Sequence, residues 1–345
     1  MSDMARRGFV TGGTWCVDRN RVVEFWPGED GLVEILEEQA RGGGSACNLA
    51  FGIRRLDAGM PVETIGVVGD DENGRLLHAA AAAHGIDATG LTVVAGAPTQ
   101  FTDAYTSRRS GRRTHIFRAG AADALTPDHF DFAATRGRIL HLGLPGIHAR
   151  MDGAWGDAAN GWVATLRKAR RAGLLTNLEL CSVPAERLAA LVRPCLPELD
   201  LLVVNDVEIG AIAGMATCDH GETDIAACLR AARAVLASGA MRLVAVHFPR
   251  GAIAVARDGT VAAKASVRVP EAEIAGANGA GDAFASGFLY GFHEGWETAR
   301  ALALAHAAAA VSLRSIGTTD AIEAWQDCLD IACRWGWREE LTGLG

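Results

Sequence analysis

Short apolar runs alternate along the chain with longer segments of helical periodicity. We expect the apolar runs to be strands, and they occupy residues 64–69, 139–143, 174–180, 201–205 and 243–248, with a first strand near residues 6–10. Strands that alternate with helices form parallel pairs joined by crossovers, so this spacing predicts a mainly parallel sheet covered by helices on both faces. No long Pro-, Ser- or Gly-rich linker or repeat divides the chain, and we expect a single domain over residues 1–345.

Two segments do not follow this alternation. Residues 14–40 and 99–119 read as extended strands joined by turns such as Ser110-Gly111. They predict a small second sheet outside the main one.

The stretch 276–284 combines a glycine-rich turn, a carboxylate and the start of a helix. Phe284, Phe288 and Phe292 recur at helical spacing, so Asp282 falls in the first turn of that helix. Glycines allow consecutive backbone N–H groups to converge on an anion, and the helix N-terminus adds partial positive charge. A carboxylate beside such a cradle favours a general base that takes a proton from an attacking hydroxyl. The alternative is an acidic N-cap on a buried helix.

Charge and composition narrow the classes of partner. The chain has 33 Lys and Arg against 41 Asp and Glu, a formal net charge of −8, so no basic field favours nucleic acid or an anionic membrane as partner. The two lysines, Lys168 and Lys264, do not follow a glycine-rich loop, which excludes a Walker A or protein-kinase lysine.

Eight cysteines form no C-x-x-C pair, and they predict free, buried thiols in a reducing, cytoplasmic compartment. The alanine-rich stretch 301–313 is too short to span a bilayer and predicts a buried helix.

Gly279-Ala280-Gly281-Asp282 closely resembles the signature of the ribokinase-like (PfkB) family of carbohydrate kinases. In that family the glycine-rich turn forms an anion hole and the aspartate is the catalytic base. The resemblance therefore implies that Asp282 activates the acceptor hydroxyl, while the backbone of Gly279, Ala280 and Gly281 stabilises charge on the transferred phosphoryl group.

A second block, made of two pieces, supports the same resemblance, and it stands in the family's order. Gly43, Gly44 and Asn48 match its GG-x-x-x-N motif, and residues 69–74 are similar to its G-D-D-x-x-G block. Paired glycines permit close approach of a ligand, and the Asn48 amide can both donate to and accept from a polyol. A tight turn entering a helix is the alternative for both pieces, and we favour it for residues 69–74.

The third block is Asn205 and Glu208, at the end of an apolar run, which match the family's N-x-x-E motif. The resemblance implies that they hold Mg²⁺ and its waters near the ATP phosphates, mostly without direct coordination. The alternative for Asn205 is a cap on the next helix.

Taken over the whole chain, the resemblance implies a ribokinase-like three-layer α/β/α fold with a small β-sheet lid formed by residues 14–40 and 99–119, which often also makes a dimer contact. Asp18 falls where the family places an aspartate that holds sugar hydroxyls, although it can also be a solvated turn residue. Gly251 and His306 fall near the nucleotide, and a core histidine bonded to the backbone is the alternative for His306. Four lid residues are candidate substrate contacts or simple strand surface: Tyr105, Arg113, His115 and Arg118.

The chain departs from the family at three places. Gly276-Ala277 stands where many members carry Asp-Thr at a monovalent-cation site, residues 247–251 replace a Thr and a short glycine loop, and residues 177–180 lack the common Asp-x-Asn-x-Arg form. These departures affect the nucleotide site and the identity of the acceptor more than catalysis.

We therefore expect an ATP- and Mg²⁺-dependent kinase of a small sugar or sugar-derived acceptor, dimeric through its lid. A nucleoside kinase of the same family is the alternative. A non-catalytic binding module would not need Asp282, and a Rossmann-type oxidoreductase would need G-x-G-x-x-G after the first strand, which Gly12-Gly13 does not begin.

Overall fold

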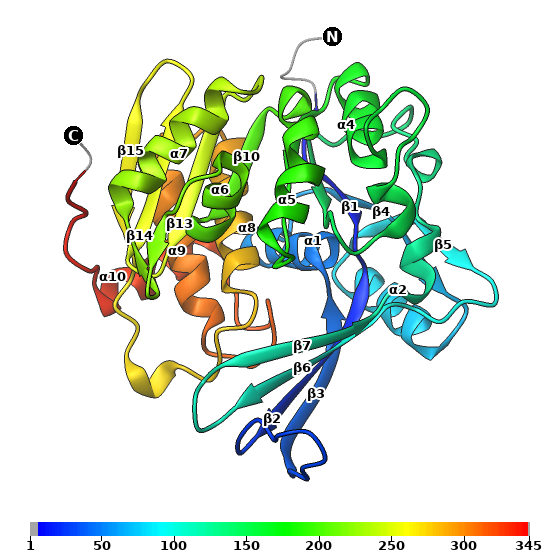
Figure 1. The fold of residues 1–345 in the computed structure, drawn as a ribbon, viewed down its shortest axis with the longest axis horizontal. Coiled ribbons are helices and arrows are strands. Elements are labelled where there is room, and N and C mark those ends of the chain that lie inside the picture. The colour runs from blue at the N-terminus through cyan, green and yellow to red at the C-terminus, as the bar shows by residue number, and fades with distance from the viewer. Residues whose placement is uncertain (1–5, 344–345) are drawn as a thin grey trace.

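The computed structural model describes residues 6–343, and the parts of the expected single domain at 1–5 and 344–345 lie outside the described residues. Its centre is a nine-stranded sheet (Figure 1). In spatial order its strands are β15 (Val261–Ala265), β14 (Gly251–Ala256), β13 (Leu243–Phe248), β10 (Leu201–Asn205), β9 (Leu175–Leu178), β8 (Ile139–Gly143), β1 (Phe9–Gly13), β4 (Val62–Gly69) and β5 (Asp87–Val94). All neighbours from β13 to β5 pair in parallel, and β14 and β15 add an antiparallel edge.

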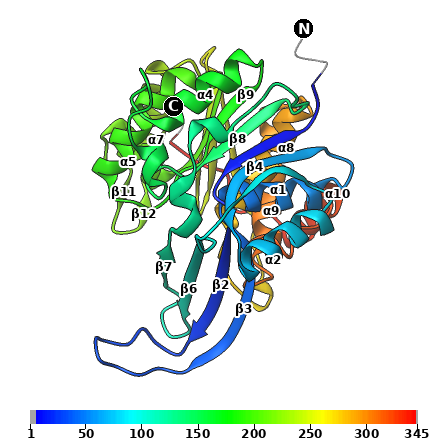
Figure 2. The same ribbon diagram turned by 90° about the vertical axis from the view of Figure 1, so that its right-hand side faces the viewer.

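Helices cover both faces of this sheet (Figure 2). One face carries α1 (Ser45–Leu56), α2 (Glu72–Ala83), α8 (Ala280–His293), α9 (Thr298–Ser312) and α10 (Trp325–Trp335). The other carries α3 (Ala149–Asp152), α4 (Gly161–Arg171), α5 (Ala185–Val192), α6 (Asp206–Ala213) and α7 (Ile225–Ala237). Alternate strand residues enter the two cores: Leu201 and Val203 face one, and Leu202 and Val204 face the other. A strand buried on both faces therefore appears in the sequence as an unbroken apolar run.

A separate four-stranded sheet, here called the lid, projects from the main body (Figure 1). Its strands in spatial order are β3 (Ile35–Gly43), β2 (Cys16–Val23), β6 (Phe101–Ser107) and β7 (Arg113–Arg118). β2 and β6 are parallel, and the two outer strands are antiparallel to them. A short hairpin of β11 (Cys218–Asp219) and β12 (Glu222–Thr223) follows α6.

The expected α/β class, the mainly parallel sheet and the separate small sheet are confirmed. The five apolar runs form β4, β8, β9, β10 and β13, and the alanine-rich stretch lies in α9. The strands β5, β14 and β15 were not predicted from the sequence. β5 and β15 are edge strands with few strongly apolar residues, and β14 follows β13 after a two-residue turn. The lid strand β3 also continues past residue 40 to Gly43.

Residues 69–74 form the expected turn into a helix. Asp71 caps α2 by accepting a hydrogen bond from the Gly74 N–H at 2.9 Å, and its carboxylate also binds Thr99. The eight cysteines are free, as expected, but only five of them are buried: Cys181 and Cys218 are half-buried and Cys333 is exposed. Within residues 6–343, no helix is long and apolar enough to cross a membrane.

Helices α8 and α9 approach each other closely because small residues line their contact. A Cβ atom at Gly287 would lie 2.7 Å from the Cα of Ala305, and one at Gly291 would lie 2.9 Å from the Cα of Ala301. These backbone atoms cannot rotate away, so glycine is required at both positions. The close contact fixes α8, whose first turn carries the glycine-rich loop and Asp282.

We expect Gly287→Ala to destabilise the protein, since the added methyl meets the backbone of α9 and overpacking of this kind costs about 1–3 kcal/mol. Gly281→Ala, in the same helix, is the matched control for stability, because its Cβ would lie 3.6 Å from His247, an ordinary contact. Alanine there removes the helical penalty of glycine, about 1 kcal/mol. Thermal unfolding of the two variants should shift in opposite directions, and equal shifts would contradict this account of α8–α9 packing.

Candidate active site

Two cavities meet at the N-terminus of α8. One, the lid cavity, has a volume of about 470 Å³ and lies between the lid and the carboxyl ends of the central strands. The other, the helix cavity, has a volume of about 500 Å³ and is lined from β13, α8 and α9. Five residues line both: Asn205, His247, Ala277, Ala280 and Gly281. The cavities are therefore two halves of one site, joined at the glycine-rich loop.

Asp282 lies at this junction, in the first turn of α8. Burial, together with the nearby carboxylates of Asp18 and Glu208, raises the pKa of its carboxyl to about 7, against the opposing effect of a hydrogen bond from Asn48. A group with this pKa can both accept and release a proton near neutral pH. The helix begins after Gly279, whose φ of 73° suits glycine, and a Cβ there would lie 2.6 Å from Thr318.

Asn48 holds Asp282 from α1. Its Nδ2 donates to Oδ2 of Asp282 at 3.1 Å, and its Oδ1 accepts from the Thr318 hydroxyl at 2.9 Å. An ionised carboxylate only accepts hydrogen bonds, so Asp282 requires the Asn48 N–H to point toward it, and Oδ1 is left to accept from the Thr318 hydroxyl. The expected polyol ligand Asn48 is thus first a positioning residue for Asp282, with one N–H left for another partner.

Asp18 projects from β2 into the lid cavity. Burial raises the pKa of its carboxyl to about 6, although the thiol of Cys16 donates a hydrogen bond to it at 3.4 Å. A side chain on the neighbouring Gly43 would collide with this carboxylate. Gly43 itself does not line the cavity, so it makes room for Asp18, whereas Gly44 lines it directly with a φ of 87°.

Asn205 and Glu208 form a capping box at the start of α6. The Glu208 N–H donates to Oδ1 of Asn205 at 2.8 Å, and the Asn205 N–H donates to Oε2 of Glu208 at 3.0 Å. The alternative that Asn205 caps the next helix is therefore what the structure shows, and both side chains also line the lid cavity. Burial raises the pKa of the Glu208 carboxyl to about 7.

The two residues expected near a nucleotide differ in position. His306 lines the helix cavity, where its Nε2 lies 3.2 Å from the Lys264 carbonyl and its ring packs edge-on against Phe284. Both alternatives for His306, a cavity residue and a core histidine bonded to the backbone, therefore hold together. Gly251 lines neither cavity; it begins β14 after the turn from β13, opposite Phe248.

Alternation along the strands puts the lid residues on two faces, one toward the lid cavity and one away from it. Arg113, His115 and Phe117 line the lid cavity, whereas Tyr105 and Arg118 belong to the opposite face by their register. Arg113 Nη1 also donates to Oδ1 of Asn278 at 3.0 Å. The other end of the same amide donates to Asn20 at 2.9 Å, so two lid strands are tied directly to the glycine-rich loop.

Glu179 lines the lid cavity and was not anticipated from the sequence. Burial raises the pKa of its carboxyl well above the usual range, and Asp282 and Glu208 raise it further. Its nearest partner is His141, with Nε2 at 3.4 Å from Oε2. Its position just after the end of β9 was the available signal, because parallel strands present their carboxyl ends to the same crevice.

A model of the pfkB family carbohydrate kinases matches residues 9–325. The chain belongs to this family. The resemblance expected from the three motifs and the enzyme class are thereby confirmed.

Relatives in this kinase family cover nearly the whole chain. An "ATP-dependent ribose-1-phosphate kinase" of Halopiger xanaduensis is 27% identical over 88% of this chain and 92% of the relative. A "5-dehydro-2-deoxygluconokinase" of Geobacillus thermodenitrificans is 26% identical over 91% and 89%. Among solved structures, ribokinase from Giardia lamblia superimposes with a TM-score of 0.77 at 18% identity, covering 96% of this chain and all of that one. The ribokinase-like fold is thus confirmed.

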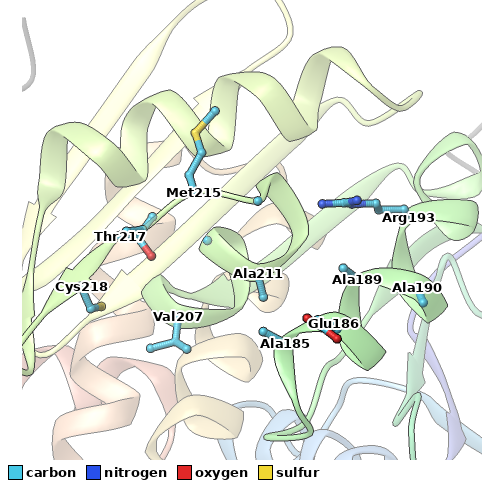
Figure 3. Close-up of a pocket in the computed structure, with 13 residues that line it drawn as sticks. Ala185, Glu186, Ala189, Ala190, Arg193, Val207, Ala211, Met215, Thr217 and Cys218 are labelled. Atoms are coloured by element: carbon cyan, nitrogen blue, oxygen red, sulfur yellow. The ribbon is translucent and has the colours of Figure 1, made fainter.

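The kinase has another hollow (Figure 3), and none of residues 276–282 lines it. It measures about 630 Å³ and lies between α5 and α6, lined mostly by small side chains such as Ala189 and Ala211. Its one guanidinium, of Arg193, is already bonded through Nε to the Ile212 carbonyl at 2.9 Å. None of the residues anticipated from the sequence lines it, and it has no converging polar groups comparable with those around Asp282.

The raised pKa of Asp282 predicts a pH-dependent cost to stability. Its folded value, about 7, exceeds the ordinary 3.8, so ionisation favours the unfolded chain and stability falls as pH rises between these values. Asn cannot ionise. We therefore expect Asp282→Asn to raise the unfolding midpoint relative to wild type more at pH 8 than at pH 5.

Asp157→Asn is the control, because that carboxylate is 97% exposed and the substitution should change little at either pH. If the unfolding midpoints of Asp282→Asn and wild type differ by the same amount at pH 5 and pH 8, ionisation of Asp282 does not destabilise the folded protein.

Proposed function

We propose that this protein transfers the γ-phosphoryl group of ATP to a hydroxyl of a small sugar or sugar-derived acceptor, with Asp282 as the general base. The observation that carries the proposal is the half-buried Asp282 carboxyl, which lines the lid cavity beside its junction with the helix cavity and is oriented by Asn48. The acceptor occupies the lid cavity and ATP the helix cavity. The acceptor oxygen then attacks phosphorus as its proton passes to Asp282, and ADP leaves with the bonding electrons.

The backbone of Gly279, Ala280 and Gly281 supplies the anion hole in this proposal. The first N–H groups of a helix have no partner within the helix, and those of α8 begin at this loop. They lie next to the carboxyl that takes the proton, which puts positive partial charge where negative charge develops. Closure of the lid over the acceptor excludes water as a competing nucleophile.

Asn205 and Glu208 are proposed to hold Mg²⁺ through water. Their side-chain oxygens are hard donors at the junction, which suits this ion. Among residues 6–343, no cluster of three or more His, Cys, Asp or Glu side chains is built to hold a metal by itself, which favours indirect contact. When bound, Mg²⁺ neutralises charge on the phosphates.

The acceptor is proposed to be a polyol, because Asp18 and Glu179 offer acceptor oxygens to several hydroxyl groups. A nucleoside is the second candidate. It is favoured by Phe117, whose side chain is 49% exposed, lines the lid cavity and offers a ring on which a base can stack. A relative from Schizophyllum commune, 26% identical, bears the name adenosine kinase.

ADP release tests the function. With Mg²⁺ and a panel of sugars, sugar acids, sugar phosphates and nucleosides, we expect turnover with one acceptor class, and a loss of roughly 10²–10⁴ in kcat for Asp282→Asn, the usual contribution of a general base. ATP affinity should change little, because Asp282 contacts the acceptor. Asp18→Asn is the comparison variant and should raise the acceptor KM more than it lowers kcat. Wild-type turnover by folded Asp282→Asn would refute the base.

We further propose one cytoplasmic kinase domain that forms a homodimer through the outer face of its lid. This face carries Ile116, 53% exposed, and Trp26, 49% exposed, which packs edge-on against Tyr105. An uncovered sheet face with exposed apolar side chains is typical of an association surface.

Sedimentation of the wild type at micromolar concentration should show a dimer, and Ile116→Glu should convert it to a monomer with unchanged thermal stability. Val93→Glu is the control, since Val93 is equally exposed, at 50%, but lies on β5 of the main sheet. A monomeric wild type would refute the dimer without affecting the kinase proposal.

A further inference from the structure

His247 is the one ionisable side chain among the described residues that lines both cavities. The other four shared residues are an asparagine, two alanines and a glycine. A phosphoryl group that passes from the helix cavity to the lid cavity must cross the junction where this imidazole lies.

The ring of His247 is held against the first turn of α8. His247 is the last residue but one of β13 and pairs in register with Asn205 on β10. Its ring packs on Phe284 with a centroid distance of 4.8 Å, and a Cβ at Gly281 would lie 3.6 Å from its Cε1 and 3.8 Å from its Nε2. No side chain or backbone group of residues 6–343 hydrogen-bonds to the ring, so its polar atoms are available to a ligand.

Few other positively charged side chains lie near the junction. Arg113 faces the lid cavity alone, and Arg338 faces the helix cavity alone. Neither lysine lines either of these two cavities: Lys168 donates to the Pro127 carbonyl at 2.7 Å, and the Lys264 ammonium packs 4.0 Å from the centre of the Trp337 ring.

The groups that face His247 are Asp206 at the start of α6 and His306 on α9. Burial lowers the pKa of the His247 imidazole to about 4, which Asp206 partly opposes. Burial also lowers the pKa of His306 to about 3, and its proximity to His247 lowers it further. The free ring is therefore neutral, with one N–H to donate, and a bound triphosphate favours its protonated form.

Resting on the proposed function, we propose that His247 is a further catalytic residue that donates a hydrogen bond to a non-bridging oxygen of the γ-phosphoryl group. The ring transfers no proton in the reaction. The new O–P bond forms to the acceptor, the bond between Pγ and the β–γ bridging oxygen breaks, and the hydroxyl proton goes to Asp282 while His247 remains bonded to the phosphoryl oxygen. Together with the backbone N–H groups of Ala280 and Gly281, the imidazole surrounds the phosphoryl group on the side away from the acceptor carboxylates.

The test compares nucleotides that have and lack the γ-phosphate. Calorimetric affinities for ADP and for the non-hydrolysable β,γ-imido analogue of ATP, both with Mg²⁺, should be measured for wild type, His247→Leu and His247→Gln. We expect His247→Leu to bind ADP like wild type but to bind the triphosphate analogue about 10–100-fold more weakly, the effect of one charge-assisted hydrogen bond. His247→Gln, whose amide N–H reaches about as far as Nε2, should recover part of the loss.

His306→Leu is the matched control, because His306 lines the helix cavity alone and should affect both nucleotides equally. Equal weakening of ADP and the analogue by His247→Leu, or no weakening of either, would overturn the proposal. Absence of binding of both nucleotides to the wild type would instead contradict ATP as the donor. If His247→Leu does not fold, the affinities of His247→Gln and wild type for ADP and for the analogue are compared instead. A loss of affinity for the analogue alone still requires a contact between residue 247 and the γ-phosphate.

Discussion

The site depends on one half-buried carboxylate being held at the start of a helix by groups from two distant parts of the chain. Asp282 alone would pay the desolvation cost of its charge, and burial already raises its pKa to about 7. Asn48 offsets part of that cost, and the Thr318 hydroxyl donates to the other end of the Asn48 amide. Helix α1, helix α8 and the loop after α9 must therefore be placed together before the carboxylate has a defined direction.

Close approach of these elements is possible because small residues lie where they cross. A side chain at Gly52 of α1 would collide with Ser286 of α8, and a side chain at Gly279 would collide with Thr318. The glycines of the site have two separate uses. Gly279 and Gly44 adopt a positive φ, whereas Gly52 and Gly43 lack that requirement and make space for a neighbouring atom. A sequence motif shows that glycine is present without showing which use applies.

The sequence predicted what local pattern determines. Apolar runs predicted five of the inner strands because those strands are buried on both faces, and the glycine-rich loop was placed before α8 because phenylalanines mark that helix. Thr318 was not predicted, since it lies in no local pattern and reaches the site only through the packing of distant segments. Glu179 was not predicted either, although its position just after the end of β9 was a signal. Asn48 was placed in the site for contact with a polyol, but its bonds to Asp282 and Thr318 could not be read from spacing alone.

The charged and polar groups around the junction suit the two cavities to different ligands. Four carboxyl groups line the lid cavity, those of Asp18, Glu179, Glu208 and Asp282. Burial raises the pKa values of all four, and repulsion from others of the four adds to the shift for Glu179 and Asp282. These carboxyl groups accept hydrogen bonds and repel phosphate, so the lid cavity suits a ligand rich in hydroxyl groups. The opposite side of the junction offers the free N–H groups of α8, which attract phosphate. A phosphoryl group at the junction therefore lies between a surface that accepts protons and one that stabilises anions, and transfer to a hydroxyl needs both.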